Sequence, residues 1–501
     1  MRLLSLLALA TALLTAYACE VETEFVTGQA VQLRFSQDTL TFDTVFTDRG
    51  SATRLIKVYN DGDEPVMIDR ISVAGMTGVN YTFNADGFRG PLAEDVIIWG
   101  RDSIFVFVEV EVDPTDPEHV SPFIAEDRLR FTTGATRREV TLLAFGQNAF
   151  YINGRNAGGL FAIRCDGGTA VLPQDLPTVI YGAAFIDSCV VQALPGTRIY
   201  VHGGVQRNRE QVGGSGIFNA GIIRTEAGGS LQLLGTLDNP VIVRTDRLEA
   251  EFAEAVGSYR GLWFGAGSRG NIIRHARLTN AILGVQVDSA AQLTVENSTI
   301  AHTRGSALNA RLAEVTVRNS LFHSNFAENI VITDGGRYVL DHLSVGSFGQ
   351  TAAALAAFNF NPDPNLPDDQ RFVYPLDLRV RNSILGGNDN NELILADGAA
   401  GEEPDLFRVR IDNSVVRTND EFLQTQMGLF ADFYGRICRG CVNLDFSDPL
   451  FLNVGEDDYH LDTMSVARDI GRFLPELPRD LEGVERDPET PDAGALELRE
   501  D

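Results

Sequence analysis

Lysine is almost absent from this 501-residue sequence: Lys57 is the only one, so 40 of the 41 basic side chains are arginines. A mechanism that needs a lysine base or Schiff base is therefore excluded outside the neighbourhood of Lys57. Basic charge is scarce overall, because 69 acidic residues outnumber the basic ones and the formal net charge is −28. This acidic excess argues against a basic face for nucleic acid or anionic lipid, and we expect no nucleic-acid partner.

Long hydrophobic runs are missing as well. A transmembrane helix needs about 20 apolar residues, and apart from residues 3–14 no segment approaches that length. Because this short run follows a positive start at Arg2, it predicts an export signal peptide over residues 1–18.

The end of this signal allows two interpretations. Ala16 and Ala18 fit an ordinary small-x-small cleavage site, whereas the cysteine that follows them, Cys19, resembles that of a bacterial lipobox, although Ala16 stands where leucine is usual. The acidic run Glu20–Glu24 resembles the surface-export signal of Bacteroidota lipoproteins. That resemblance implies lipidation of Cys19, a lipidated acidic linker over residues 19–25, a membrane partner through the lipid anchor, and an outer-membrane protein exposed at the cell surface.

Residues 26–148 read as an antiparallel β-sandwich. Alternating apolar runs at residues 53–59, 104–112 and 139–145 are separated by turn formers such as Asp86-Gly87. About seven strands in some 120 residues is the size of an immunoglobulin-like sandwich. The order of these runs resembles the Ig-like module of bacterial and ciliary surface proteins, which implies a spacer or stalk.

A repeated phrase marks the rest of the chain. An apolar residue, a short polar run and a second apolar stretch recur with their third position at His275, Asn297, Asn319 and His342, so the period is 22 or 23 residues. The phrase returns with Asn382 and Asn413 after longer gaps, which indicates loops inserted into a regular coil. Three short strands and three turns would account for one coil of this length.

This period predicts stacked coils whose inward side chains form aliphatic rows. The recurrent polar residue marks a bend, and stacked Asn amides can bond one another and the turn backbone. We therefore predict a structural ladder. Its members are His275, Asn297, Asn319, His342, Asn382 and Asn413.

The repeat resembles the right-handed parallel β-helix of Bacteroidota surface lipoproteins over roughly residues 150–465. The predicted fold class is therefore all-β: an N-terminal Ig-like β-sandwich, then a right-handed parallel β-helix with a C-terminal cap. Within it we expect an N-terminal cap over 149–195, the helix proper over 196–465, and a C-terminal cap and tail over 466–501.

The cysteines fit export. With Cys19 lipidated four remain, and four cysteines allow three pairings. We favour structural disulfides Cys165–Cys189 and Cys438–Cys441, because neither metal-ligand spacing nor a redox context accompanies the lone CxxC.

The sequence gives only weak indications of catalytic, glycan-binding or metal-binding residues on the β-helix. A glycoside hydrolase needs two carboxylates facing one groove, and Asp288, Asp334, Asp341 and Asp389 differ in phase, so we interpret them as solvated surface. Arg274, Arg318 and Arg381 precede the ladder and form either a glycan-facing row or a salt-bridged face. His302 and His323 are expected to be surface neighbours too weak to define a metal site. Trp263 either packs or binds sugar.

Two insertions, residues 359–369 and 386–392, are rich in oxygen ligands but lack the spacing of a recognised calcium loop. We therefore predict no cofactor and no metal, with calcium as the one alternative, and assign no catalytic residue.

The leading hypothesis is non-catalytic binding or a structural envelope role, with polysaccharide or surface proteins as partners. The alternative is a polysaccharide lyase or glycoside hydrolase acting in a lateral groove of the helix.

Overall fold

The computed structural model divides the chain into two compact units, Met1–Asn148 (unit 1) and Ala149–Asp501 (unit 2). The residues described are 25–26, 31–46, 53–75, 79–112, 123–147, 149–153, 160–203, 205–207, 217–219, 221–349, 352–367, 372–418, 430 and 432–499. The predicted signal peptide, Cys19 and the acidic run after it lie outside these residues. Nearly all described secondary structure is β, and no helix in the described part of the chain is long and apolar enough to cross a membrane.

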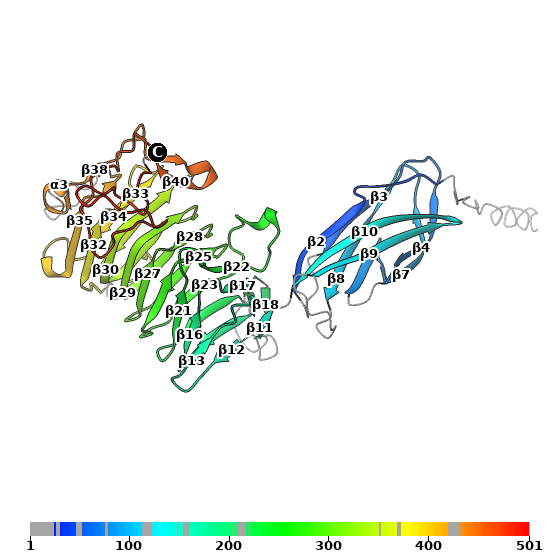
Figure 1. Ribbon diagram of the computed structural model, residues 1–501, viewed down its shortest axis with the longest axis horizontal. Helices are drawn as coiled ribbons and strands as arrows, with labels where there is room; N and C mark the ends of the chain where they lie inside the picture. Colours follow the sequence, from blue (N-terminus) through cyan, green and yellow to red (C-terminus); the bar gives the residue numbers. More distant parts are fainter. Residues whose placement is uncertain are drawn as a thin grey trace, which may run out of the picture. The chain divides into compact units, whose positions relative to one another are not determined.

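Unit 1 consists of two five-stranded sheets, with strand orders β1-β3-β8-β5-β6 and β2-β10-β9-β4-β7 (Figure 1). The strands are β1 (Leu33–Phe35), β2 (Thr39–Phe46), β3 (Arg54–Asn60), β4 (Val66–Val73), β5 (Val79–Ala85), β6 (Phe88–Gly90), β7 (Leu92–Ile98), β8 (Ser103–Val112), β9 (Phe123–Thr133) and β10 (Thr136–Gln147). Side chains alternate as predicted: in β8, Val106 is buried while Phe105 is 47% exposed. The inward residues of both sheets form one apolar core.

One pairing differs from the antiparallel expectation, because β2 runs parallel to β10. The physical reason is connectivity: after β2 the chain passes to β3 in the other sheet, so no hairpin joins β2 to its neighbour β10. The immunoglobulin-like assignment of this unit stays a prediction.

Unit 2 is a solenoid built on a 26-stranded, mostly parallel sheet. Each strand pairs in parallel with its counterpart one coil later, for example β14 with β17 and β24 with β27, so three strands make one coil. Figure 1 shows these strands stacked from β13 to β35.

The first coils contain β11 (Phe150–Asn153), β12 (Leu160–Ile163), β13 (Thr169–Val171), β14 (Thr178–Tyr181), β15 (Ala183–Ile186), β16 (Val190–Ala193), β17 (Arg198–His202), the side hairpin β18 (Val205–Arg207) and β19 (Ile217–Asn219), β20 (Ile222–Thr225), β21 (Ser230–Leu234), β22 (Val241–Thr245), η3 (Ala250–Phe252) and β23 (Gly261–Phe264). The central coils contain β24 (Asn271–Arg274), β25 (Ala276–Thr279), β26 (Val285–Val287), β27 (Gln292–Glu296), β28 (Thr299–Ala301), β29 (Leu308–His323), β30 (Ile330–Ser347) and β31 (Leu355–Phe358). The last elements are β32 (Leu376–Arg381), β33 (Ile384–Gly387), β34 (Leu393–Ala396), η5 (Pro404–Leu406), β35 (Phe407–Asp412), β36 (Val415–Val416), α3 (Phe433–Arg436), β37 (Cys438–Arg439), β38 (Val442–Asn443), β39 (Phe451–Asn453), η6 (Val454–Glu456) and β40 (Asp458–Leu461).

The strand register follows the repeat read from the sequence. Val295 pairs with Val317, and Val317 pairs with Leu340. The pairing continues to Val380 and Ile411, so the two longer gaps are insertions that leave the register intact. Both insertions fall at the same corner of the coil, between β31 and β32 and between β34 and β35.

The interior of the solenoid is a stack of apolar rows. One row runs through Leu278, Ile300, Phe322 and Val345, each paired with the next and at most 1% exposed. Burying one such side chain contributes about 1.5–3 kcal/mol, and each coil can do so only against its neighbours.

The polar corner explains why Asn recurs at this position and why Ser follows it in four of the six copies of the repeat. The six predicted ladder residues all have positive φ, between 44° and 50°, a conformation that Asn tolerates better than most residues. Asn319 Nδ2 donates to Asn297 Oδ1 at 2.6 Å, and Asn382 Nδ2 lies 2.8 Å from His342 Nε2. The following serine accepts an N–H from the preceding coil, as when Ser298 N donates to Ser320 Oγ at 3.2 Å.

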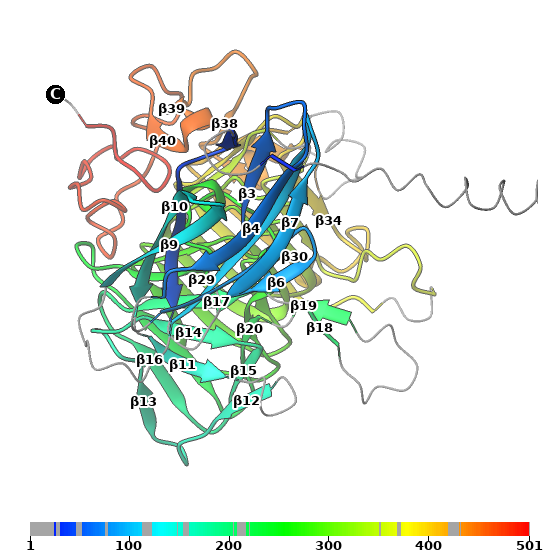
Figure 2. The same ribbon diagram turned by 90° about the vertical axis from the view of Figure 1, so that its right-hand side faces the viewer.

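The C-terminal segment differs from the predicted cap and final coil. Residues 466–499 run along the outside of the solenoid against the polar corner, where Asn413 donates to Ile470 O, Asn382 to Arg472 O and Asn319 to Arg479 O. Figure 2 shows this segment, orange to red, beside the coils. The polar ladder supplies hydrogen-bond partners along the side of the stack, and docking there leaves Asn319 2% and Asn382 1% exposed.

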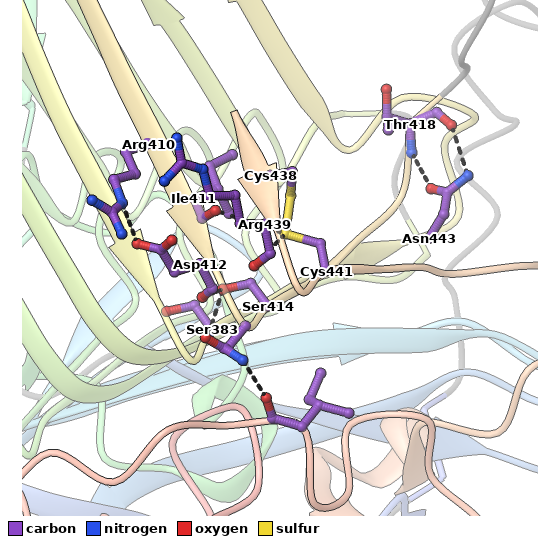
Figure 3. Close-up of a disulfide and its surroundings, with 12 residues drawn as sticks. Ser383, Arg410, Ile411, Asp412, Ser414, Thr418, Cys438, Arg439, Cys441 and Asn443 are labelled. Atoms are coloured by element: carbon purple, nitrogen blue, oxygen red, sulfur yellow. Dashed lines mark hydrogen bonds and ion pairs between the residues drawn. A yellow bond between two sulfur atoms is a disulfide. The ribbon is translucent and has the colours of Figure 1, made fainter. Parts of the chain in front are cut away.

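Two disulfides close short segments of unit 2. Cys165 bonds Cys189, 24 residues later, and Cys438 bonds Cys441, three residues later. The second lies where β37 joins the last coil, beside Asp412 and Ser414 (Figure 3).

Candidate functional site

A lateral groove of about 500 Å³ lies between the solenoid and its C-terminal segment. One wall is an outward row of three stacked coils, Arg277 in β25, Thr299 in β28 and Leu321 in β29. The other wall is made by residues 456–460, at the end of η6 and the start of β40, and by residues 481–482 of the C-terminal segment. The groove therefore exists because that segment packs beside the coil instead of continuing it.

Histidine is concentrated in this groove: His275, His302, His323 and His460 line it, four of the seven in the chain. Burial, and then the charge of Arg274, lowers the pKa of His275. Imidazole is the side chain best suited to exchange protons near neutral pH and a common metal ligand, so the groove is the first place to look for chemistry.

His460 in β40 lies between two carboxylates. Its Nδ1 is 2.6 Å from Asp458 Oδ1, and its Nε2 is 3.2 Å from Glu482 Oε2. Burial acts to lower the pKa of His460, but the hydrogen bonds to Asp458 and Glu482 outweigh it and the pKa is raised. The hydrogen bond from His460 lowers the pKa of Asp458. Arg499 also contacts Glu482.

A second cluster lies in the same groove. His302 Nε2 is 2.9 Å from Asp457 Oδ2, and His323 Nδ1 is 3.1 Å from Asp457 Oδ1. Ser324 Oγ donates to Asp457 Oδ1 at 2.6 Å. The hydrogen bond from His323, followed by that from Ser324, holds the pKa of Asp457 far below its usual value.

The four carboxylates considered from sequence lie outside the residues that line the groove. Asp288 accepts a hydrogen bond from Trp263 Nε1 at 2.6 Å, Asp334 pairs with Arg311 at 2.5 Å, and buried Asp341 pairs with Arg381 at 2.6 Å. Asp389 accepts a hydrogen bond from the backbone N–H of Asn391. Sequence reasoning missed Asp457, Asp458 and Glu482 because they belong to the segment that lacks the repeat; three consecutive polar residues before Tyr459 were the only signal.

Trp263 is half-buried on another face of the coil. Its ring lies 5.0 Å from the guanidinium of Arg224 and 5.9 Å from that of Arg260, and its indole N–H is taken by Asp288. These contacts place it outside the groove and fit the packing interpretation.

The predicted arginine row is a ladder of alternating charge. Through the strand register, each member is stacked on the next. The order is Arg274, Glu296, Arg318, Asp341, Arg381, Asp412, Arg439. Arg318 lies 3.7 Å from Glu296 and 3.6 Å from Asp341, while Arg381 contacts Asp341 through two nitrogens. Because acidic neighbours neutralise Arg318 and Arg381, this charge ladder matches the salt-bridged alternative more closely than a glycan-facing row.

Of the two oxygen-rich loops, the described part of residues 359–369 belongs to the insertion between β31 and β32, whereas residues 386–392 form the end of β33 and the short turn to β34 and are not an insertion. In the first, Asp363 Oδ1 accepts the N–H of Asn365 at 2.9 Å. In the second, Glu392 is fully buried, accepts N–H groups of Asp389 and Ala354, and has its pKa raised to about 7 by burial. Within the described ranges, the one cluster of three possible metal ligands is His302, His323 and Asp457, and it includes no residue of either loop.

No protein-family model and no curated protein matches the chain. Solved structures give distant matches: a family 123 glycoside hydrolase from Clostridium perfringens (5% identity, 27% of this chain, 31% of that chain, TM-score 0.19) and the GH87 α-1,3-glucanase of Streptomyces thermodiastaticus (11%, 72%, 66%, TM-score 0.26). The GH87 α-1,3-glucanase catalytic domain with nigerose also matches (11%, 74%, 81%, TM-score 0.18).

These matches correct the leading functional hypothesis. The matched structures are glycoside hydrolases by name, whereas the leading hypothesis was non-catalytic binding or a structural envelope role, and that hypothesis is not kept. At TM-scores of 0.26 or lower the matches carry no argument about the function of this chain, which must come from the geometry of its own groove.

Proposed function

We propose that this chain is a glycoside hydrolase that cleaves a glycan in the lateral groove. The observation that carries the proposal is the pair of carboxylates, Asp458 and Glu482, on opposite sides of His460. Hydrolysis at a sugar carbon needs two carboxyl groups about 5–10 Å apart, one to deliver a proton and one to activate water or stabilise the cation. A single imidazole ring bridges the two here, with contacts of 2.6 Å and 3.2 Å to its two nitrogens. With about 2.2 Å across the ring, the two bonded oxygens are at most about 8 Å apart, below the upper limit that glycosidases use.

The arrangement suggests a division of roles. Held between two carboxylates, His460 is a proton reservoir that delivers a proton, directly or through Glu482, to the oxygen of the breaking glycosidic bond. Asp458 takes a proton from the water whose oxygen bonds to the sugar carbon. The products are two shorter glycans, and the proton that Asp458 took from water passes to His460 through their hydrogen bond, which returns both groups to their starting states.

The walls offer the other contacts that a sugar requires. Arg277, Asn297 and Thr299 present polar groups to the groove, and Leu237 and Leu481 present apolar surface. Pockets for small ligands commonly combine apolar surface with a few polar groups that fix orientation. A chain of sugars could therefore lie along the stacked coils.

The test is release of reducing ends from a panel of neutral and acidic polysaccharides by the purified protein. We expect Asp458→Asn and Glu482→Gln each to lower the rate about 100-fold or more, since removing a general acid or base typically costs 10²–10⁴-fold. Asp288→Asn is the matched control, because this carboxylate lies outside the groove. Absence of cleavage on every glycan, or equal loss in the control, would overturn the proposal.

We also propose the context that the sequence resemblance implies: a right-handed coil, an Ig-like spacer in unit 1, and an outer-membrane lipoprotein anchored through Cys19. The small residues before Cys19 and the acidic run after it support the anchor. Cys19→Ser is expected to release the protein from the membrane fraction, and retention of the variant there would contradict lipid anchoring.

A further inference from the structure

Two histidines from adjacent coils converge on one carboxylate in the groove. His302 directly follows β28 and His323 ends β29, and the register pairs Ala301 with His323. Asp457 reaches them from the segment before β40. The three ligand atoms all lie within 4.8 Å of one another, and both imidazoles direct a nitrogen to a different oxygen of the same carboxylate.

This convergence is fixed by the surroundings. The two imidazole rings meet edge to face with centroids 5.7 Å apart, and Tyr459 packs on His323 at 4.7 Å. Ser324 Oγ donates to Asp457 Oδ1 and so orients the carboxylate. Partners that orient a ligand from behind are typical of metal sites and raise affinity about 10–100-fold.

We propose that His302, His323 and Asp457 bind one divalent transition-metal ion. Two imidazoles and one carboxylate form a donor set suited to Zn²⁺ and its neighbours. Metal-ligand bonds of about 2.0–2.2 Å place ligand atoms about 3–4 Å apart around one ion, which the contacts of 2.9 and 3.1 Å allow. Ca²⁺ prefers six to eight oxygen ligands and is a poor match.

The position of the cluster leaves room for further ligands. Side-chain exposure is 13% for His302, 8% for His323 and 30% for Asp457, so the carboxylate side faces the groove. Three protein ligands with an accessible fourth position are the arrangement of catalytic zinc sites, whereas structural sites are closed. The ion would bind an oxygen of water or of a groove ligand. This inference does not depend on the proposed hydrolase.

The experiment is a metal titration of the purified full-length protein after chelator treatment, followed by calorimetry and by elemental analysis of the dialysed protein. Zn²⁺ is the probe, with Mn²⁺ and Ca²⁺ compared. We expect one Zn²⁺ per chain, weaker Mn²⁺ binding and no Ca²⁺ binding. His302→Ala and Asp457→Asn should each weaken Zn²⁺ binding about 100-fold or more.

His202→Ala is the matched control, because His202 Nδ1 also contacts a carboxylate, Asp246, at 2.7 Å, but the pair is not part of a three-ligand cluster in the described structure. His302→Asn tests the site with a smaller disturbance and should also weaken binding. Zn²⁺ binding that is absent, or unchanged in the His302 and Asp457 variants, would overturn the metal site. The readout is independent of glycan cleavage, so either proposal can fail alone.

Discussion

The two units bury polar groups by different means. Among the described residues of unit 1, few polar side chains are buried. One of them is Asn60, whose side chain donates to the backbone carbonyls of Glu64 and Ile98. Unit 2 buries whole rows of them: Ser298, Ser320, Ser383 and Ser414 are each at most 1% exposed. In a stack of coils, the partner of a buried polar group is the same kind of residue one coil away, so polar rows are satisfied as regularly as apolar ones.

This difference has a functional consequence. Among the described residues of unit 1, no group of three or more side chains could hold a metal ion. In unit 2 the stack places chemically similar residues one coil apart, as with His302 and His323. A segment that docks alongside, as residues 456–482 do, can then complete a site with groups of its own.

The largest effects are expected in the apolar cores and would show whether the units are independent. Phe322 and Phe131 are fully buried in units 2 and 1, respectively. Replacing either with alanine should cost about 3–5 kcal/mol, because a large cavity remains. In scanning calorimetry of the full chain, we expect Phe322→Ala to lower one thermal transition and Phe131→Ala the other. A shift of both transitions by either variant would show coupling and break the comparison.

A smaller loss of stability is expected when a charge of the ladder in unit 2 is removed, and a still smaller one for a surface charge of unit 1. Arg381 pairs with Asp341, which is fully buried, so Arg381→Ala leaves a carboxylate with only the more distant Arg318 and should cost about 3 kcal/mol. Arg130 and Glu139 in unit 1 form an exposed pair, and Arg130→Ala should cost less than about 1 kcal/mol. Denaturant unfolding measures both, and equal losses would mean that the charge ladder contributes no more than surface pairs.

The smallest effect concerns pH. Burial, and then the charge of Arg486, holds the pKa of His342 well below its usual value. As the pH falls through about 6.5, the unfolded chain is therefore protonated at this histidine while the folded chain is not. Protonation stabilises the unfolded state, so the free energy of unfolding decreases below that pH. The variant His342→Asn carries the usual ladder residue, which does not titrate. It should reduce the decrease in the free energy of unfolding by up to about 1.4 kcal/mol per pH unit. The melting temperature of each unit, followed from about pH 8 to 5.5, tests this; an unchanged slope for unit 2 would contradict it.

Much of the solenoid could be predicted because its information is periodic. The spacing of Asn297 and Asn319 gave the register directly, and the longer gap before Asn382 revealed an insertion at a corner. Alternation similarly gave the strands of unit 1. The parallel pairing of β2 with β10 could not be predicted, since it depends on which sheet the chain enters next.

The groove could not be predicted for a related reason. His302 and His323 were recognised as neighbours, but their partner Asp457 is more than 130 residues away in sequence and outside the repeat. The docking of the C-terminal segment depends on hydrogen bonds such as that from Asn413 to Ile470, which no local pattern encodes. Periodicity therefore located half of the site, and tertiary docking supplied the rest.

The charge ladder also constrains how such a chain can lengthen. The apolar rows and the polar corner repeat with every coil, so duplicating one coil would preserve both. Signs in the ladder alternate from Arg274 to Arg439, so inserting a single coil would place two like charges directly above one another, which is destabilising. Inserting two coils restores the alternation. The smallest duplication that preserves the alternation of charge is therefore a pair of coils, whereas a single coil would be enough to preserve the apolar rows and the polar corner.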